Sequence, residues 1–169
     1  MPEKIKDVQP PRGFSRLLYR LPIWLFRVHM GWMLGKRFLL LTHTGRKSGV
    51  ARQSVLEVLV YEKASSIYYV FAGWAGKADW VLNIEKTPDV VITVGNQRLQ
   101  AYATRLTPEE GERCLLVYVQ KHPVAMRVLP RLMGYRVDGT EEDFRALARL
   151  GTVFSFSVKP FYQRLEEEG

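Results

Sequence analysis

Apolar residues in the middle of the chain occur in short runs bounded by Gly, Ser, Asn and Pro, a pattern typical of β-strands. The first run covers 38–41. Between two later runs, Gly95-Asn96-Gln97 is typical of a hairpin turn. Only one short helix is expected between the third and fourth strands, so the pattern is not βαβ. We therefore expect a mostly antiparallel sheet of about six strands that can close as a barrel. The other five runs cover 53–61, 67–72, 90–94, 98–106 and 153–158.

Helix starts are recognisable around these strands. Thr107 is followed by Pro108 and, three residues after the threonine, by Glu110, which is the pattern of a capping box at the start of a helix. Asp79 is expected to cap a short helix that Thr87-Pro88 ends. The fold class predicted from strands and helices together is α+β, with peripheral helices around the barrel. The remaining predicted helices cover 125–133 and 140–150.

Residues 14–35 are predicted to form an N-terminal helix that is apolar on nearly every face, after a flexible leader over 1–13. Arg16, Arg20 and Arg27 fall within roughly 40° of one another if this helix continues through Pro22. The pattern fits an amphipathic helix that makes peripheral contact with a lipid interface. A core helix that covers a sheet is the competing interpretation. No run of eighteen apolar residues occurs, so a membrane-spanning helix is not expected.

Length and charge restrict the class of protein. The 169 residues fit one domain, with the barrel over 36–159 and a helical insertion near 107–150. The net charge is +8, and residues 1–41 hold eight Lys and Arg against two acidic residues, 8 − 2 = +6. Basicity therefore belongs to the N-terminal segment and points to a membrane surface or an anionic partner, with no nucleic-acid motif. Cys114 is the single cysteine, which excludes an intrachain disulfide and fits a cytoplasmic location, with the inner membrane face as a further option.

One stretch between the first two strands, 42–52, concentrates cations, hydroxyls and glycines. Glycines let a backbone turn with positive φ and approach a ligand closely, while Arg and Lys side chains surround phosphate or carboxylate oxygens. The spacing is not that of a nucleotide-binding P-loop. The stretch is therefore interpreted as an anion cradle, and a solvated hairpin turn with ordinary surface charge is the alternative. The residues concerned are Thr44, Gly45, Arg46, Lys47, Ser48, Gly49 and Arg52.

The order of motifs resembles the deazaflavin-dependent nitroreductase family. The resemblance rests on the run 38–49 (FLLLTHTGRKSG), then Arg52, the segments 56–58 and 72–74, Trp80 with Asn83, and 88–90, and it covers about residues 36–123. It implies a split β-barrel related to flavin-binding pyridoxamine-phosphate oxidases. It also implies a bound deazaflavin coenzyme, F-420, whose phosphate and glutamate tail the cradle would hold.

The resemblance further implies that a second loop borders the deazaflavin ring, with Trp80 and Asn83 fixing that loop and its following helix. Core packing is the alternative role for Trp80. In this chain the loop is shorter than usual in the family, so its ring contacts are expected to differ. The implied cofactor-binding residues, beyond those of the cradle, are Ala72, Gly73, Trp74, Lys77, Trp80 and Asn83.

The expected reaction is hydride transfer between the reduced deazaflavin and a small or lipid-like acceptor such as an activated alkene, a quinone or a nitro compound. The tyrosines that follow a Tyr-Pro or His-Pro step in family members are missing after His122-Pro123. Tyr118 and Tyr135 are the candidates that remain for a proton donor. Three scattered histidines and one cysteine predict no metal site.

Two other functions stay open from the sequence. The same barrel with an apolar N-terminal helix would suit a non-catalytic protein that binds fatty acid or another lipid at a membrane surface. FMN could also replace the deazaflavin in a related enzyme. Neither the physiological acceptor nor the oligomeric state, of which a homodimer is one option, follows from the residues.

Overall fold

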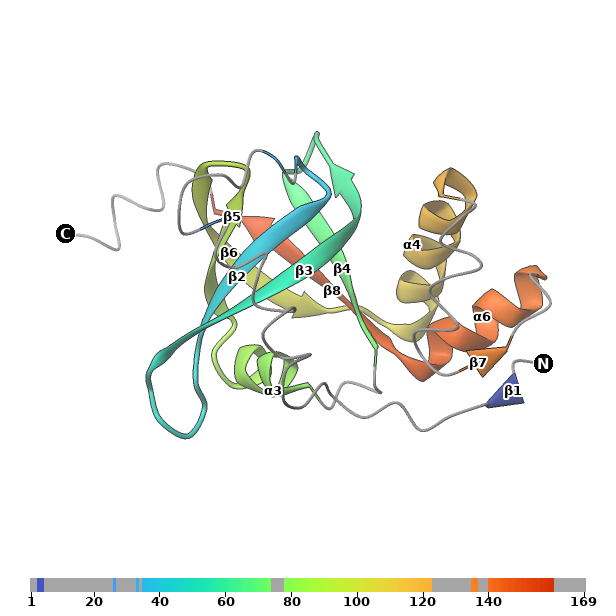
Figure 1. Ribbon diagram of the computed structural model, residues 1–169, viewed down its shortest axis with the longest axis horizontal. Helices are drawn as coiled ribbons and strands as arrows, with labels where there is room; N and C mark the ends of the chain where they lie inside the picture. The colour runs from blue at the N-terminus through green and yellow to red at the C-terminus, as the bar shows by residue number, and fades with distance from the viewer. Residues whose placement is uncertain are drawn as a thin grey trace.

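Six antiparallel strands form a closed barrel in the computed structural model, which describes residues 3–4, 26, 33, 35–73, 78–122, 135–136 and 140–159. The strand order is β2-β3-β4-β8-β6-β5, and β5 pairs back onto β2 (Figure 1). This confirms the predicted α+β fold class with a mostly antiparallel barrel. The strands are β2 (Phe38–Thr44), β3 (Ala51–Glu62), β4 (Ile67–Ala72), β5 (Asp89–Val94), β6 (Gln97–Arg105) and β8 (Thr152–Val158).

Alternate residues of each strand point into the barrel. Most of these inward residues are apolar, so the interior forms a hydrophobic core. In β2 the inward positions include Leu39 and Leu41, both with no exposed surface. In β8 the rings of Phe154 and Phe156 fill the interior, and both are almost fully buried. His43 continues the inward register of β2 and is also buried, at 5% exposure. The histidine is therefore a polar group at one end of an otherwise hydrophobic barrel.

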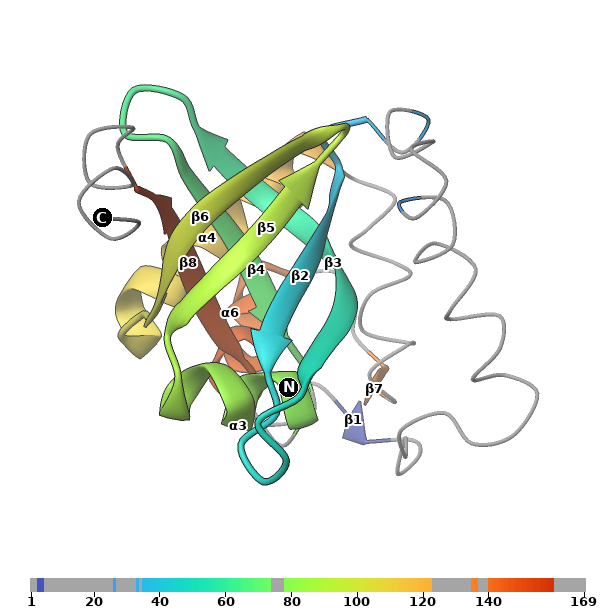
Figure 2. The same cartoon turned by 90° about the vertical axis from the view of Figure 1, so that its left-hand side faces the viewer.

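Three described helices cover the barrel from two directions. Helix α3 (Asp79–Lys86) joins β4 to β5 and lies across one end of the barrel, where Val81 and Ile84 enter the interior core (Figure 1). Helices α4 (Pro108–Lys121) and α6 (Glu141–Leu150) pack against each other outside the barrel, where α4 contacts β3 and β8; both helices lie behind the barrel in Figure 2. A second hydrophobic cluster forms there from Leu59, Leu115, Tyr118, Val119, Ala148 and Val153.

The predicted helix starts have different outcomes. Thr107 and Glu110 form the expected capping box, and Thr140 caps α6 by accepting a hydrogen bond from the backbone of Asp143. The prediction that Asp79 caps α3 is wrong, since the N-cap is Ala78 and Asp79 is the first helical residue. Its carboxylate accepts a hydrogen bond from a distant arginine instead, a contact that local sequence does not reveal.

Strand β3 is longer than its partner β4, so part of β3 extends beyond the pairing between these two strands. Pairing between β3 and β4 begins at Val58 and contains an irregularity between Val58 and Val60. Among the described strands, residues 51–57 of β3 therefore pair with β2 alone. This segment, which we call the β2-paired half of β3, runs from the turn after β2 to Glu57.

Tight packing near Gly151 gives a testable prediction for stability. A Cβ atom on Gly151 would collide with the ring of Phe71 and lie 2.9 Å from the carbonyl oxygen of Ala72, which is backbone and cannot rotate away. We expect Gly151→Ala to lower the free energy of unfolding by about 1–3 kcal/mol through overpacking. Urea denaturation measures the change. Gly73→Ala is the control, because its Cβ would meet the Phe71 ring at an ordinary 3.9 Å; equal losses in both variants would contradict the prediction.

Several predicted segments lie outside the described residues, including the helix over 125–133 and all of 14–35 except Phe26, Met33 and Gly35. A short antiparallel pair joins β1 (Glu3–Lys4) to β7 (Tyr135–Arg136). In the part of the chain that the structure describes, no helix is long and apolar enough to cross a membrane.

Candidate functional site

The predicted anion cradle is the turn between β2 and β3. The backbone N–H of Gly45 donates to the oxygen of Val50 at 2.9 Å, and that of Gly49 donates to the oxygen of Gly45 at 2.8 Å. Gly49 has the expected positive φ of 68°, which favours glycine. Gly45 does not have a positive φ, contrary to the expectation; a Cβ atom there would lie 2.8 Å from Oγ of Ser48. The dihedral angle of the turn thus favours glycine at position 49, whereas a Cβ atom at position 45 would crowd the Ser48 hydroxyl and lie 3.2 Å from the Val50 carbonyl oxygen.

Arg46 anchors this turn to α3. Its Nη1 donates to Oδ1 of Asp79 at 2.9 Å and to Oδ1 of Asn83 at 3.1 Å, and its backbone N–H donates to the same Asn83 oxygen at 3.0 Å. Nζ of Lys86 donates to the Arg46 carbonyl at 3.0 Å. Arg46 therefore has a structural task that its neighbours do not share, since two residues of α3 engage its guanidinium.

The other two cations of the cradle are available to a ligand. Lys47 and Arg52 are exposed, and within the described residues the side chain of neither has a hydrogen-bond or ion-pair partner. Ser48 is exposed beside them, and its Oγ lies 3.4 Å from the backbone nitrogen of Val50. Thr44, at the end of β2, is half-buried. The structure thus brings the cradle residues together on the turn and the adjoining ends of β2 and β3, with two exposed cations.

His43 and Asn83 lie buried beneath the turn. Nδ2 of Asn83 lies 3.1 Å from Nδ1 of His43, and Nε2 of His43 lies 3.4 Å from Oγ of Ser54. Burial lowers the pKa of His43, the nearby charge of Arg52 lowers it further, and Asp79 acts in the opposite direction. In the sequence, His43 is one of three scattered histidines to which no role is assigned. Its place in the inward register with Leu39 and Leu41 was the signal that could have identified it.

The second predicted region, after β4, is described only in part. Ala72 is buried in the barrel core and Gly73 is half-buried, while Trp74 and Lys77 lie outside the described residues. Trp80 makes an edge contact with Phe154 at a centroid distance of 5.7 Å, as a packing residue does. The Asn83 side chain points to the turn after β2, whereas the resemblance had implied that it fixes the loop after β4.

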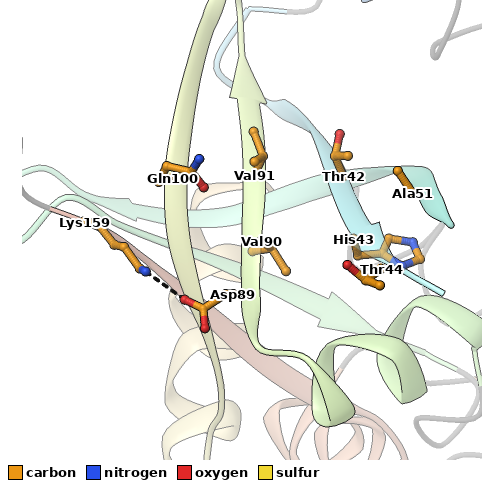
Figure 3. Close-up of a pocket in the computed structure, with 9 residues that line it drawn as sticks. All are labelled: Thr42, His43, Thr44, Ala51, Asp89, Val90, Val91, Gln100 and Lys159. Atoms are coloured by element: carbon orange, nitrogen blue, oxygen red, sulfur yellow. Dashed lines mark ion pairs between the residues drawn. The ribbon is translucent and has the colours of Figure 1, made fainter. Parts of the chain in front are cut away.

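A groove of about 330 Å³ lies on the outer barrel wall beside the turn (Figure 3). Thr44 and Ala51, which pair at the base of the turn, form one end of it. An ion pair of 2.8 Å between Lys159 and Asp89 closes the other side. Polar side chains without a hydrogen-bond partner in the described part of the chain are Thr42, Thr44 and Gln100. The lining comprises Thr42, His43, Thr44, Ala51, Asp89, Val90, Val91, Gln100 and Lys159.

Of the two tyrosine candidates, Tyr118 is buried at 2% exposure and its hydroxyl donates to Oε1 of Glu57 at 2.7 Å. Nε of Arg37 donates to the same oxygen at 3.0 Å. Burial, together with the Glu57 carboxylate, raises the pKa of Tyr118 to about 12. The phenol therefore stays protonated at neutral pH, with its proton directed at Glu57. The side chain of Tyr135 lies outside the described residues.

Comparison with known proteins assigns the family. A family model described as F420H(2)-dependent quinone reductase matches residues 23–128, more than half of the chain. The chain belongs to this family. The match confirms the resemblance to deazaflavin-dependent enzymes that the sequence motifs suggested. It includes the turn, α3 and Glu57, whereas α6 and β8 follow the matched segment.

Solved structures agree with the fold. A structure of an F420-H2 dependent reductase, FDR-A, is 24% identical with a TM-score of 0.51, covering 73% of this chain and 96% of its own. A domain-swapped dimer is 23% identical with a TM-score of 0.52, covering 85% of this chain and 92% of its own. The protein Atu2129 of unknown function from Agrobacterium tumefaciens is 16% identical with a TM-score of 0.52, covering 90% of this chain and 60% of its own. No curated protein matches.

Proposed function

We propose that this protein binds the deazaflavin coenzyme F-420 and reduces a quinone or a similar small or lipid-like acceptor. The observation that carries the proposal is a pair of exposed cations whose side chains have no hydrogen-bond or ion-pair partner among the described residues: Lys47 on the turn that α3 holds in place, and Arg52 beside it at the start of β3. Membership of the F420H(2)-dependent quinone reductase family supports it. When bound, the coenzyme would supply the hydride, so the protein needs no nucleophile or metal of its own for this step.

The residues of the turn fit an anionic coenzyme tail. Arg and Lys side chains make the strongest hydrogen bonds of proteins when they meet phosphate or carboxylate oxygens. Lys47 and Arg52 would hold the acidic groups, with the Ser48 hydroxyl as a further donor. Arg46 would act by keeping the turn on α3.

Two surfaces next to the turn suit the uncharged parts of the ligands. The β2-paired half of β3, residues 51–57, starts at the turn and leads to the Glu57 carboxylate. The groove on the outer wall offers the Thr42 and Thr44 hydroxyls and the Gln100 amide. These residues would orient two flat molecules and exclude water between them, which is the main contribution of a protein to hydride transfer. Tyr118 remains a candidate proton donor, acting together with Glu57.

Cofactor titration tests the proposal. Purified protein is titrated with F-420 and, separately, with FMN, and the fluorescence of each cofactor is followed. We expect saturable binding of F-420, weaker binding of FMN, and quinone-dependent oxidation of the reduced deazaflavin. Absence of F-420 binding, with saturable FMN binding or with lipid that copurifies, would overturn the proposal. Light scattering of the same sample measures whether the chain forms a homodimer, as the domain-swapped relative does.

A further inference from the structure

We propose that His43 and Asn83 are positioning residues that form a proton-sensitive latch beneath the anion-binding turn. A neutral His43 fixes the orientation of the Asn83 amide, and the amide oxygen in turn fixes the backbone of Arg46. Protonation of His43 releases the turn. The consequence for coenzyme affinity rests on the proposed function, whereas the latch itself does not.

The hydrogen-bond partners of Asn83 determine which way its amide points. The backbone N–H and Nη1 of Arg46 are donors only, and both lie within 3.1 Å of one side of the amide. That side must be the oxygen, so the NH2 group faces His43. Nδ1 of His43, at 3.1 Å, must then accept, and the ring proton resides on Nε2 beside Oγ of Ser54. One arrangement of protons satisfies the whole chain of contacts.

A second proton on His43 would break this arrangement. Protonated Nδ1 would confront the NH2 group of Asn83, donor against donor. If the amide rotated to relieve the conflict, its NH2 group would meet two Arg46 donors instead. In either case a buried hydrogen bond is lost, because Asn83 is only 4% exposed and water cannot readily replace the partner.

Burial and the charge of Arg52 favour the neutral form of His43. Arg52 approaches from β3 and Asp79 from α3, and the Asp79 carboxylate is already engaged by Arg46. Burial and, after it, the charge of Arg52 lower the pKa of His43 below its ordinary value of about 6.5, and Asp79 acts in the opposite direction. The latch is therefore closed at neutral pH and opens as the pH falls through the lowered pKa.

The latch matters for binding because Lys47 follows Arg46 directly in the turn. A turn that is already fixed loses less conformational entropy when it binds an anion, which increases affinity. Opening the latch would leave the cations in place but free the backbone that carries Lys47. We expect F-420 affinity to fall about tenfold. This factor corresponds to about 1.4 kcal/mol, the contribution of one hydrogen bond.

Nuclear magnetic resonance tests the latch without any ligand. Long-range nitrogen–proton correlation spectra of the protein should show that the His43 ring proton is on Nε2 and that Nδ1 is unprotonated. In Asn83→Asp the carboxylate has no proton to donate, so His43 should acquire one on Nδ1 and titrate at a higher pH than in the wild type. Asn96→Asp adds the same charge on the exposed turn between β5 and β6 and should leave the His43 titration unchanged. A proton on Nδ1 in the wild type, or a His43 pKa unmoved by Asn83→Asp, would overturn the proposal.

Binding measurements test the consequence for the coenzyme. His43→Gln offers an acceptor oxygen to Asn83 but cannot titrate, whereas His43→Leu offers no acceptor. At neutral pH we expect F-420 affinity within about threefold of wild type for the glutamine variant and about tenfold weaker for the leucine variant. When the pH is lowered, the F-420 affinity of the wild type should fall more than that of His43→Gln. The glutamine variant has no titrating group at position 43, so its loss of affinity serves as the reference for titration of the coenzyme. Circular dichroism confirms that each variant is folded.

These measurements separate the two proposals. If the wild type binds no F-420, the proposed function fails while the spectra of His43 still decide the latch. If F-420 binds and folded His43→Leu binds equally well, the latch has no role in binding and this inference is overturned.

Discussion

Replacing Lys47 and Arg52 together with alanine is expected to raise the dissociation constant for F-420 by about 100-fold or more. A hydrogen bond to a charged group contributes about 1.5–3 kcal/mol, and 1.4 kcal/mol corresponds to a factor of ten. Because both side chains are exposed, we take the lower end of this range for each. The free energy of unfolding should stay nearly constant, since neither cation has a partner among the described residues. Fluorescence titration gives the affinity, and urea denaturation gives the stability.

The control variant removes two equally exposed cations at the opposite end of the barrel. Lys63 lies in the turn between β3 and β4, and Arg98 lies beside the hairpin turn between β5 and β6. Lys63→Ala with Arg98→Ala changes the net charge by the same amount and should alter F-420 affinity less than about threefold at physiological salt. Equal losses in the two double variants would indicate general electrostatic attraction and contradict a specific cradle at the turn.

Arg46 is expected to behave differently from its neighbours. The sequence placed it in one group with Lys47 and Arg52, because nothing local distinguishes three cations in one turn. The structure separates them through contacts with Asp79 and Asn83, which are 33 and 37 residues away in the sequence. Arg46→Ala should therefore lower stability as well as affinity, so it cannot serve alone as a test of ligand contact.

The barrel itself was predictable because its pattern is local. The strands occur in the sequence as short apolar runs bounded by turn residues, and Gly95-Asn96 marks a hairpin whatever its surroundings, here with a φ of 58° at Gly95. The Thr107 capping box is likewise complete within four residues. In contrast, Asp79 carries the signal of a helix cap, yet its carboxylate is used in an ion pair with Arg46 across the fold.

The candidate site was predictable as a motif but not as a network. Glycines and cations at 45–52 could be found by composition, and the resemblance added Trp80 and Asn83 as a pair. The contact of Asn83 with His43 joins residues 40 positions apart, so only the closure of α3 over the barrel end brings them together. The groove on the outer wall depends on the register of β2, β5 and β6, which no motif encodes.

The largest expected effect on stability is that of Phe156→Ala. The Phe156 ring has no exposed surface and lies in the barrel interior, where β8 pairs with β4 and β6. Removing a buried phenylalanine ring costs about 3–5 kcal/mol, because apolar contacts are lost and the surrounding strands cannot collapse into the cavity. The total free energy of unfolding of a domain of this size is about 5–15 kcal/mol, so the variant should lose a large share of its stability. Urea denaturation followed by circular dichroism measures the loss.

Tyr102→Ala is the matched control for this prediction. Tyr102 pairs with Ser157, next to Phe156 in β8, but its side chain is on the outer face and the residue is 46% exposed. Its truncation should cost less than about 1 kcal/mol, since little buried surface is lost. If Phe156→Ala were no more destabilising than Tyr102→Ala, the barrel interior would not be closely packed around β8. The turn and α3 depend on the same interior, because Val81 and Ile84 of α3 pack into it, so the cradle would then lack the rigid support that its function requires.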